Sequence, residues 1–197
     1  MKKFLDVQNN IEIDFSVNDL PMVVHGREHS GSSLFSITMA AHLHNQGNKI
    51  LMFTAYPMAT EEFLKQVGED ASVCFLENWT QIEESQGYQT IIVQSGDKDL
   101  CVSALTTLQD IHSRIAFIKN VEDMLDDNIA NAININERTL LSGDVDATLC
   151  KEFIKKVNYK TKILFSDSNI LPKEIPTLEK YQACAFKENN RFIVSLI

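Results

Sequence analysis

Two glycines spaced like those of a phosphate-binding loop are the strongest candidates for chemistry in the sequence. Residues 22–35 read MVVHGREHSGSSLF, which is an apolar segment, a glycine-framed turn and a second apolar segment. Gly26, Gly31 and Ser33 fit the frame G-x-x-x-x-G-K-[ST], in which backbone N–H groups surround a phosphate. The N-terminus of the helix expected behind the turn adds partial positive charge. However, Ser32 occupies the position of the lysine that contacts the terminal phosphates.

The loop offers few replacements for that lysine. A serine hydroxyl donates one hydrogen bond but cannot neutralise phosphate charge. Arg27 and His29 are the candidate donors nearby, although solvent-facing positions are favoured for both, because nothing in the sequence fixes their direction. The alternative interpretation of the whole segment is a plain glycine turn between a strand and a helix.

The segment GREHSGSS resembles the phosphate loop of the RecA-type ATPases, which reads GPESSGKT in the bacterial recombinase. The shared positions are Gly26, Glu28, Ser30, Gly31 and the hydroxyl residue Ser33. The resemblance implies a RecA- or KaiC-like fold. It also implies that the loop binds ATP with Mg²⁺ and that Ser33 is the Mg²⁺ ligand. The nucleotide-binding residues that it implies are Gly26, Arg27, Glu28, His29, Ser30, Gly31, Ser32 and Ser33.

The acidic residues that this resemblance requires are missing. In the family an apolar strand ends in an aspartate that orders the Mg²⁺ water shell. The best candidate strand, 90–93, is followed by Gln94, and the strand at 115–118 is followed by Lys119 and Asn120. The water-activating glutamate is also missing, since the strand after the loop helix ends at Thr54. We therefore expect no catalytic residues. If the strand order is RecA-like, the turn at 94–97 is expected to lie beside the loop.

Strands and helices alternate along the chain, which predicts one α/β domain over residues 1–197 with a mainly parallel sheet covered by helices on both faces. An N-terminal edge segment (1–20) and a C-terminal β-hairpin (180–197) complete it. The expected strands are 11–15, 22–25, 49–54, 72–76, 89–94, 114–118, 139–141, 162–165, 181–186 and 191–196. The expected helices are 34–43, 60–67, 99–111, 121–132 and 149–157. The hairpin is expected to extend one edge of the sheet.

Composition limits the possible partners. The net charge of −9 and the pI near 5.0 argue against general affinity for nucleic acid or for an anionic membrane. No apolar run approaches the ~20 residues that span a bilayer, and the N-terminus lacks the pattern of a secretion signal. The four cysteines form no C-x-x-C pair, so buried free thiols and a cytoplasmic location are expected.

Three functional hypotheses follow. The first is a degenerate RecA-like protein without efficient ATP hydrolysis. It would be an assembly or regulatory subunit that forms a homo-oligomer or binds a related RecA-like subunit through hairpin 181–196 and edge strand 11–15. The second is a genuine ATP-binding protein or slow ATPase of the RecA/KaiC type, with Arg27 and the loop backbone in place of the lysine. The third is an unrelated α/β enzyme whose ligand is a small anion.

Overall fold

A mixed sheet forms the centre of the molecule. The computed structural model describes residues 2–27, 30–54, 57–68, 72–94, 97–119, 127–135, 137–144, 159–165, 178–179, 181–187 and 190–196. Among these residues, eleven strands form one sheet in the order β2-β1-β11-β10-β9-β3-β8-β7-β4-β6-β5. The strands are β1 Phe4–Asp6, β2 Ile11–Ile13, β3 Met22–His25, β4 Lys49–Phe53, β5 Val73–Leu76, β6 Thr90–Val93, β7 Arg114–Lys119, β8 Thr139–Gly143, β9 Thr161–Phe165, β10 Gln182–Lys187 and β11 Asn190–Leu196.

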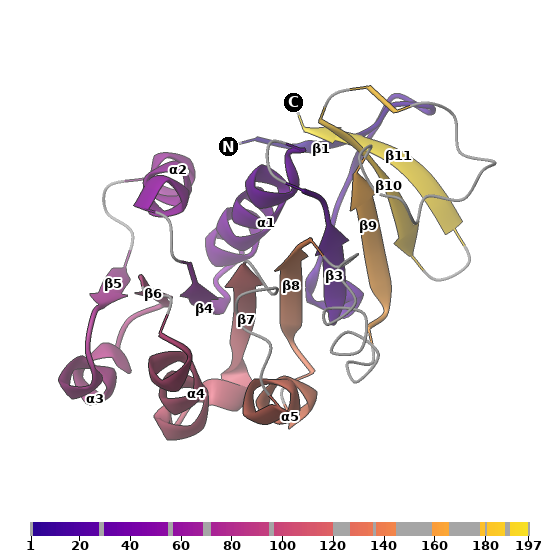
Figure 1. Ribbon diagram of the computed structural model, residues 1–197. Helices are drawn as coiled ribbons and strands as arrows, with labels where there is room; N and C mark the ends of the chain where they lie inside the picture. Colours follow the sequence, from indigo (N-terminus) through magenta and orange to yellow (C-terminus); the bar gives the residue numbers. More distant parts are fainter. Residues whose placement is uncertain are drawn as a thin grey trace.

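Helices cover both faces of this sheet, as the alternation of elements predicted (Figure 1). Helices α1 (Ser32–Asn45) and α2 (Pro57–Val67) pack on one face, while α3 (Ile82–Ser85), α4 (Lys98–Thr107) and α5 (Asp127–Ile135) cover the other. Short 3₁₀ helices lie at Val17–Asp19, Trp79–Gln81 and Ile111–Ser113. Strands β9, β3, β8, β7, β4, β6 and β5 are mutually parallel, so the loops at their carboxyl ends share one edge.

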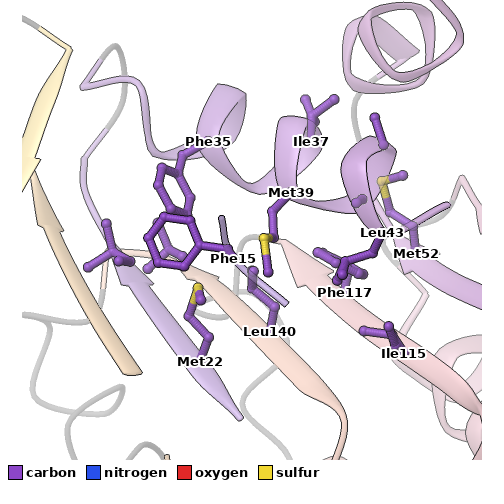
Figure 2. Close-up of a cluster of buried hydrophobic side chains, with 14 of the residues drawn as sticks. Phe15, Met22, Phe35, Ile37, Met39, Leu43, Met52, Ile115, Phe117 and Leu140 are labelled. Carbon is purple, nitrogen blue, oxygen red and sulfur yellow. The ribbon is translucent and has the colours of Figure 1, made fainter. Parts of the chain in front are cut away.

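Helix α1 is the central helix of its face. It is apolar almost all round, which predicts a buried helix, and the structure confirms this prediction. Figure 2 shows Phe35 and Met39 of α1 above the strands, with Met39 lying beside Phe117 of β7 and Leu140 of β8. Packing on this face therefore fixes where α1 begins relative to the carboxyl edge of the sheet.

The C-terminal hairpin extends the parallel strands at one edge in antiparallel fashion, as predicted, but it is not the outermost part of the sheet. Strand β10 pairs antiparallel with β9, while β11 pairs with β1, and β1 in turn pairs with β2. Strand β1 was not predicted, because three residues among polar neighbours are too few to show a strand period. The edge strand predicted at 11–15 is confirmed as β2, which covers Ile11–Ile13.

Other predictions are partly outside the described residues. The helix predicted at 149–157, the acidic start of the helix predicted at 121–132, and the hairpin turn at 188–189 all fall there. The helix predicted at 99–111 ends at Thr107 and is followed by a 3₁₀ turn. Cys101 and Cys184 are buried free thiols as predicted, and Cys74 is a half-buried one. Within the described part of the chain, none of the helices combines the length and apolar character that a bilayer span needs.

Candidate phosphate-binding site

The glycine loop lies where the parallel strands end. It follows β3, which lies between β8 and β9, and leads directly into α1. The Gly26 N–H donates to the carbonyl oxygen of Gly143 at the end of β8, with 3.2 Å between the two atoms. In open α/β sheets this edge is where ligands bind. The loop is therefore positioned by the sheet itself.

Short hydrogen-bonded turns close the loop. The Ser30 N–H donates to the Arg27 carbonyl oxygen at 3.2 Å, and the Ser32 N–H donates to the Ser30 hydroxyl oxygen at 3.2 Å. The Ser32 hydroxyl donates to the Gly26 carbonyl oxygen at 3.3 Å. Ser30 and Ser32 are both buried. Ser32 thus stabilises the loop from within, and its short side chain is occupied by that contact.

The first turn of α1 keeps its donors available. Gly31 is the N-cap and provides no side-chain cap, while the first helical bond runs from the Phe35 N–H to the Gly31 carbonyl oxygen at 2.9 Å. Among the described residues, no group accepts a hydrogen bond from the amides of Ser33 and Leu34. Unsatisfied amides at the N-terminus of a helix favour an anion. This geometry supports phosphate binding at the start of α1.

The other residues predicted to bind the nucleotide do not all lie at the start of α1. Arg27 is half-exposed and forms an ion pair with Asp144 just after β8, where the Arg27 Nε and the Asp144 Oδ2 are 3.7 Å apart. Its guanidinium therefore faces a carboxylate at the rim of the loop. Ser33, predicted as the Mg²⁺ ligand, is exposed on the first turn of α1. Glu28 and His29 lie outside the described residues.

Strand order corrects where an acidic partner was expected. Strands β8, β7 and β4 separate β6 from β3, so at about 4.8 Å per strand the end of β6 lies roughly 19 Å away. The turn at 94–97 therefore does not lie beside the loop, and Gln94 and Asp97 have structural partners instead. The Gln94 side chain donates to the Thr60 hydroxyl at 2.7 Å, and the Asp97 carboxylate caps α4.

The strand end near the loop belongs to β7 and carries a lysine. Only β8 separates β7 from β3, and β7 ends at Lys119. Lys119 is only 3% exposed. Burial lowers the pKa of its ammonium from the ordinary value of 10.5 to about 8. From the sequence, Lys119 is only a residue that stands where an aspartate is expected, because the sequence does not give the strand order that brings Lys119 close to the loop.

In the described part of the chain, the site lacks the carboxylate that orders a magnesium ion in the ATPases that this loop resembles. Thr54, which follows β4, is fully buried and provides no carboxylate. Asp144, just after β8, is a described carboxylate near the loop, and Arg27 engages it. Within the described ranges, no group of three or more His, Cys, Asp or Glu side chains could hold a metal. A buried cation, Lys119, lies where a metal-ordering carboxylate is needed, so we assign no step to a bound metal.

Gly31→Ala is expected to destabilise the protein by about 2–4 kcal/mol. Gly31 has a φ of +105°, and an added Cβ would lie 3.0 Å from both Phe165 Cε1 and Tyr181 Cδ1. Urea denaturation measures the loss. Gly47→Ala is the matched control, since its φ is +85° but its Cβ would meet nothing within 4 Å, so only about 1–2 kcal/mol is expected. Equal losses at the two positions would contradict the packing assigned to Gly31.

Comparison with known proteins finds likeness in structure but not in sequence. No protein-family model and no curated protein matches the chain. The genome packaging NTPase B204 from Sulfolobus turreted icosahedral virus 2, in complex with AMP, matches with a TM-score of 0.63 and 15% identity over 91% of this chain and 98% of that one. B204 of Sulfolobus turreted icosahedral virus, described as the DNA-packaging ATPase, matches with a TM-score of 0.55 and 13% identity, over 90% and 96% of the two chains.

A third solved structure agrees with these two. EssC (ATPases 2 and 3) from Geobacillus thermodenitrificans matches with a TM-score of 0.52 and 13% identity, over 98% of this chain and 43% of that one. Identities this low establish the fold and leave the activity open. The mainly parallel sheet and the helices on its two faces agree with these neighbours. The chain has the α/β fold of the P-loop NTPases.

Proposed function

We propose that this protein is a RecA-like nucleotide-binding subunit that binds phosphate groups at the start of α1, does not hydrolyse ATP efficiently, and serves in assembly or regulation. The observation that carries the proposal is the combination found at one edge of the sheet. Open amides at the N-terminus of α1 favour phosphate, while a buried lysine occupies the position at which hydrolysis needs a carboxylate.

Phosphate binding rests on the backbone rather than on side chains. The amides of Ser33 and Leu34 and the positive end of a 14-residue helix all point at the same edge. Gly26 allows the chain to turn closely, because an added Cβ there would lie 2.3 Å from the Ser30 hydroxyl oxygen. These features are independent of the missing loop lysine. The solved neighbours were captured with AMP, ATP-gammaS, AMPPCP and sulfate, which is consistent with this ligand class.

Loss of hydrolysis follows from three absent groups. Ser32 replaces the lysine of the loop, Lys119 replaces the acid on β7, and Thr54 ends the strand on which the water-activating glutamate is expected. Each electrostatic contact to a reacting centre is typically worth about 3 kcal/mol of transition-state stabilisation. With three such contacts missing, turnover is expected to be slower by many orders of magnitude.

The assembly role rests on the free edge of the sheet. Strand β2 ends the sheet at the N-terminal side, and Ile11 on it is 55% exposed. An exposed strand edge offers unpaired backbone groups to a second chain. Because the C-terminal hairpin is enclosed between β9 and β1, β2 is the one of the two predicted docking surfaces that remains for a second copy or a related RecA-like subunit.

The second candidate function is a genuine, slow ATPase of the RecA/KaiC type. The observation in its favour is the fold likeness to NTPases and ATPases over nine-tenths of the chain. It differs from the first candidate in requiring turnover. A sensitive hydrolysis assay therefore separates the two.

Wild-type protein is expected to bind nucleotides without turnover. Calorimetry and thermal shift with AMP, ADP and ATP, each at up to about 100 times its dissociation constant, should show stabilisation approaching about 2.7 kcal/mol. Release of labelled phosphate from ATP should not exceed that of a no-protein blank. No heat and no thermal shift at millimolar nucleotide would overturn the binding proposal. Turnover above the blank would favour the ATPase.

Light scattering tests assembly, and a monomer without any partner would contradict that role.

A further inference from the structure

We propose that Lys119 supplies the positive charge that the loop lacks at Ser32, so that this site takes a polyphosphate group as the free anion rather than as its magnesium complex. The inference rests on the proposed function for its nucleotide ligand. It adds Lys119 as a binding residue and the magnesium-free anion as the ligand. It also predicts that magnesium weakens binding, whereas the resemblance to RecA-type ATPases implies that the ligand binds together with magnesium. The lysine would come from β7 instead of from the loop.

Strand register brings Lys119 close to the loop. Lys119 is opposite Ser142 of β8, and Ser142 is opposite Val24 of β3, two residues before Gly26. At about 4.8 Å per strand, the Lys119 and Val24 Cα atoms are separated by roughly 10 Å. A lysine side chain extends over much of such a gap. The carboxyl end of β7 and the start of the loop therefore border the same small region.

The alternation of side chains directs Lys119 toward the face that α1 covers. Phe117, two residues earlier on β7, packs on that face beside Met39 of α1 (Figure 2). Ile118 packs in the cluster on the opposite face. Successive side chains of a strand point to opposite faces, so Lys119 points to the same face as Phe117. Because α1 covers this face and begins at this edge of the sheet, Lys119 and the N-terminal turn of α1 lie on the same face.

Among the residues that the structure describes, none provides a compensating charge for the buried ammonium. The Lys119 side chain forms no hydrogen bond or ion pair with any described residue. Its neighbours in the row of strand ends, Ser142 and Thr54, are uncharged, and Asp144 is engaged by Arg27. Desolvation lowers the pKa of the Lys119 ammonium to about 8, which means that keeping it charged costs the folded protein free energy. A bound phosphate would provide the missing counter-charge.

This placement also disfavours a divalent cation. A magnesium ion bound to the phosphates from the β7 side would lie next to a like charge in a poorly hydrated place. Lys119 therefore takes both roles, since its charge replaces that of the loop lysine and its position excludes the metal. We expect free pyrophosphate, or a nucleotide without magnesium, to be the preferred ligand form.

The test uses inorganic pyrophosphate as the probe and calorimetry of the full chain. Binding is measured in EDTA and again with magnesium in excess, for wild type, Lys119→Met, Lys119→Arg and Lys65→Met. Lys119→Met keeps most of the length of the side chain and removes the charged N–H donors, while Lys65→Met removes one charge from the exposed face of α2. Loss of a charged hydrogen-bond donor is expected to weaken binding roughly 10- to 100-fold. Lys119→Arg should retain most of the affinity, Lys65→Met should behave as wild type, and magnesium should weaken binding.

The outcomes separate this inference from the proposed function. If pyrophosphate binds wild type and Lys119→Met equally, or binds more tightly with magnesium, the inference is overturned and phosphate binding by the loop stands. If wild type binds no pyrophosphate, the inference fails outright. If pyrophosphate binds through Lys119 but AMP, ADP and ATP do not bind, the inference holds and the nucleotide function fails.

An exchange of charges provides a second, independent readout. Ser32→Lys combined with Lys119→Asp places a lysine in the loop and an acid on β7, which is the arrangement of the RecA-type site. The double variant is expected to require magnesium for pyrophosphate binding, whereas wild type is inhibited by it. Circular dichroism establishes that the variant is folded, and Lys119→Met remains the test if it is not. A folded double variant with the metal response of wild type would contradict the role of Lys119.

Discussion

Arg114→Met is expected to lower the free energy of unfolding by about 3–5 kcal/mol. The Arg114 side chain is fully buried at the start of β7, where its Nε donates to the Asp110 Oδ1 at 2.8 Å. The remaining guanidinium donors go to backbone carbonyl oxygens at 2.9–3.4 Å, those of Ile50, Gln86, Tyr88 and Gln89. One side chain thus joins β7 to β4 and to the segment that enters β6.

The cost comes from the partners that Arg114 would leave behind. Methionine fills much of the same volume, but the carbonyl oxygens lose their donors and Asp110 loses a hydrogen bond in a mostly buried position. Urea denaturation measures the loss. Lys49→Met is the matched control, because Lys49 pairs with the same Asp110 at 2.7 Å but is 45% exposed, so its loss should cost at most about 1 kcal/mol. Equal costs for the two variants would contradict the buried network.

The sequence predicts local features of this fold well. Residues 22–25 form a short apolar run, and the structure makes them a strand buried on both faces. The following helix was predicted as buried because its apolar residues have no preferred side, and α1 is such a helix. The loop between them was predicted from two glycines, and Gly31 does adopt a backbone conformation that favours glycine.

Relations between distant segments could not be predicted in the same way. Whether β6 or β7 ends near the loop depends on strand order, which is decided by packing between residues far apart in sequence. The short strand β1 likewise exists because β11 and β2 pair with it, not because of its own pattern. The sequence therefore shows that Lys119 stands where an acidic residue is expected, but it does not show that this lysine lies beside the loop.

Lys119→Met is expected to stabilise the unliganded protein by up to about 3 kcal/mol at pH 7. Burial lowers the pKa of the Lys119 ammonium from 10.5 to about 8, and no described group provides an opposite charge to offset that burial. Methionine has a similar length and no charge to desolvate, and its thioether adapts to irregular space. Thermal and urea denaturation of the two proteins measure the gain, with Lys65→Met as the exposed control, for which a change of a few tenths of a kcal/mol is expected.

The stability gain of Lys119→Met over wild type should decrease as the pH rises. Below pH 8, Lys119 is charged in both the folded and the unfolded chain, so the full cost of burial applies. Between pH 8 and 10.5 the unfolded chain binds more protons than the folded one, so the stability of wild type rises relative to that of Lys119→Met. Above pH 10.5 both forms are neutral and the difference disappears. A gain that does not change between pH 7 and 10.5 would show that side-chain packing, not charge, is its cause.

Taken with the pyrophosphate titrations, this result separates two reasons for a buried lysine. A lysine retained for packing alone would give no loss of anion binding on removal of its charge. A lysine retained for binding should give both a stability gain and a loss of anion binding, because the charge that destabilises the free protein is the charge that the ligand neutralises. In that case, pyrophosphate should stabilise wild type by more than it stabilises Lys119→Met, by about 1.4–2.7 kcal/mol at saturation for a 10- to 100-fold difference in affinity. The gap in stability between the two proteins then narrows as the ligand is added. A constant gap across the titration would contradict a direct contact between Lys119 and the anion.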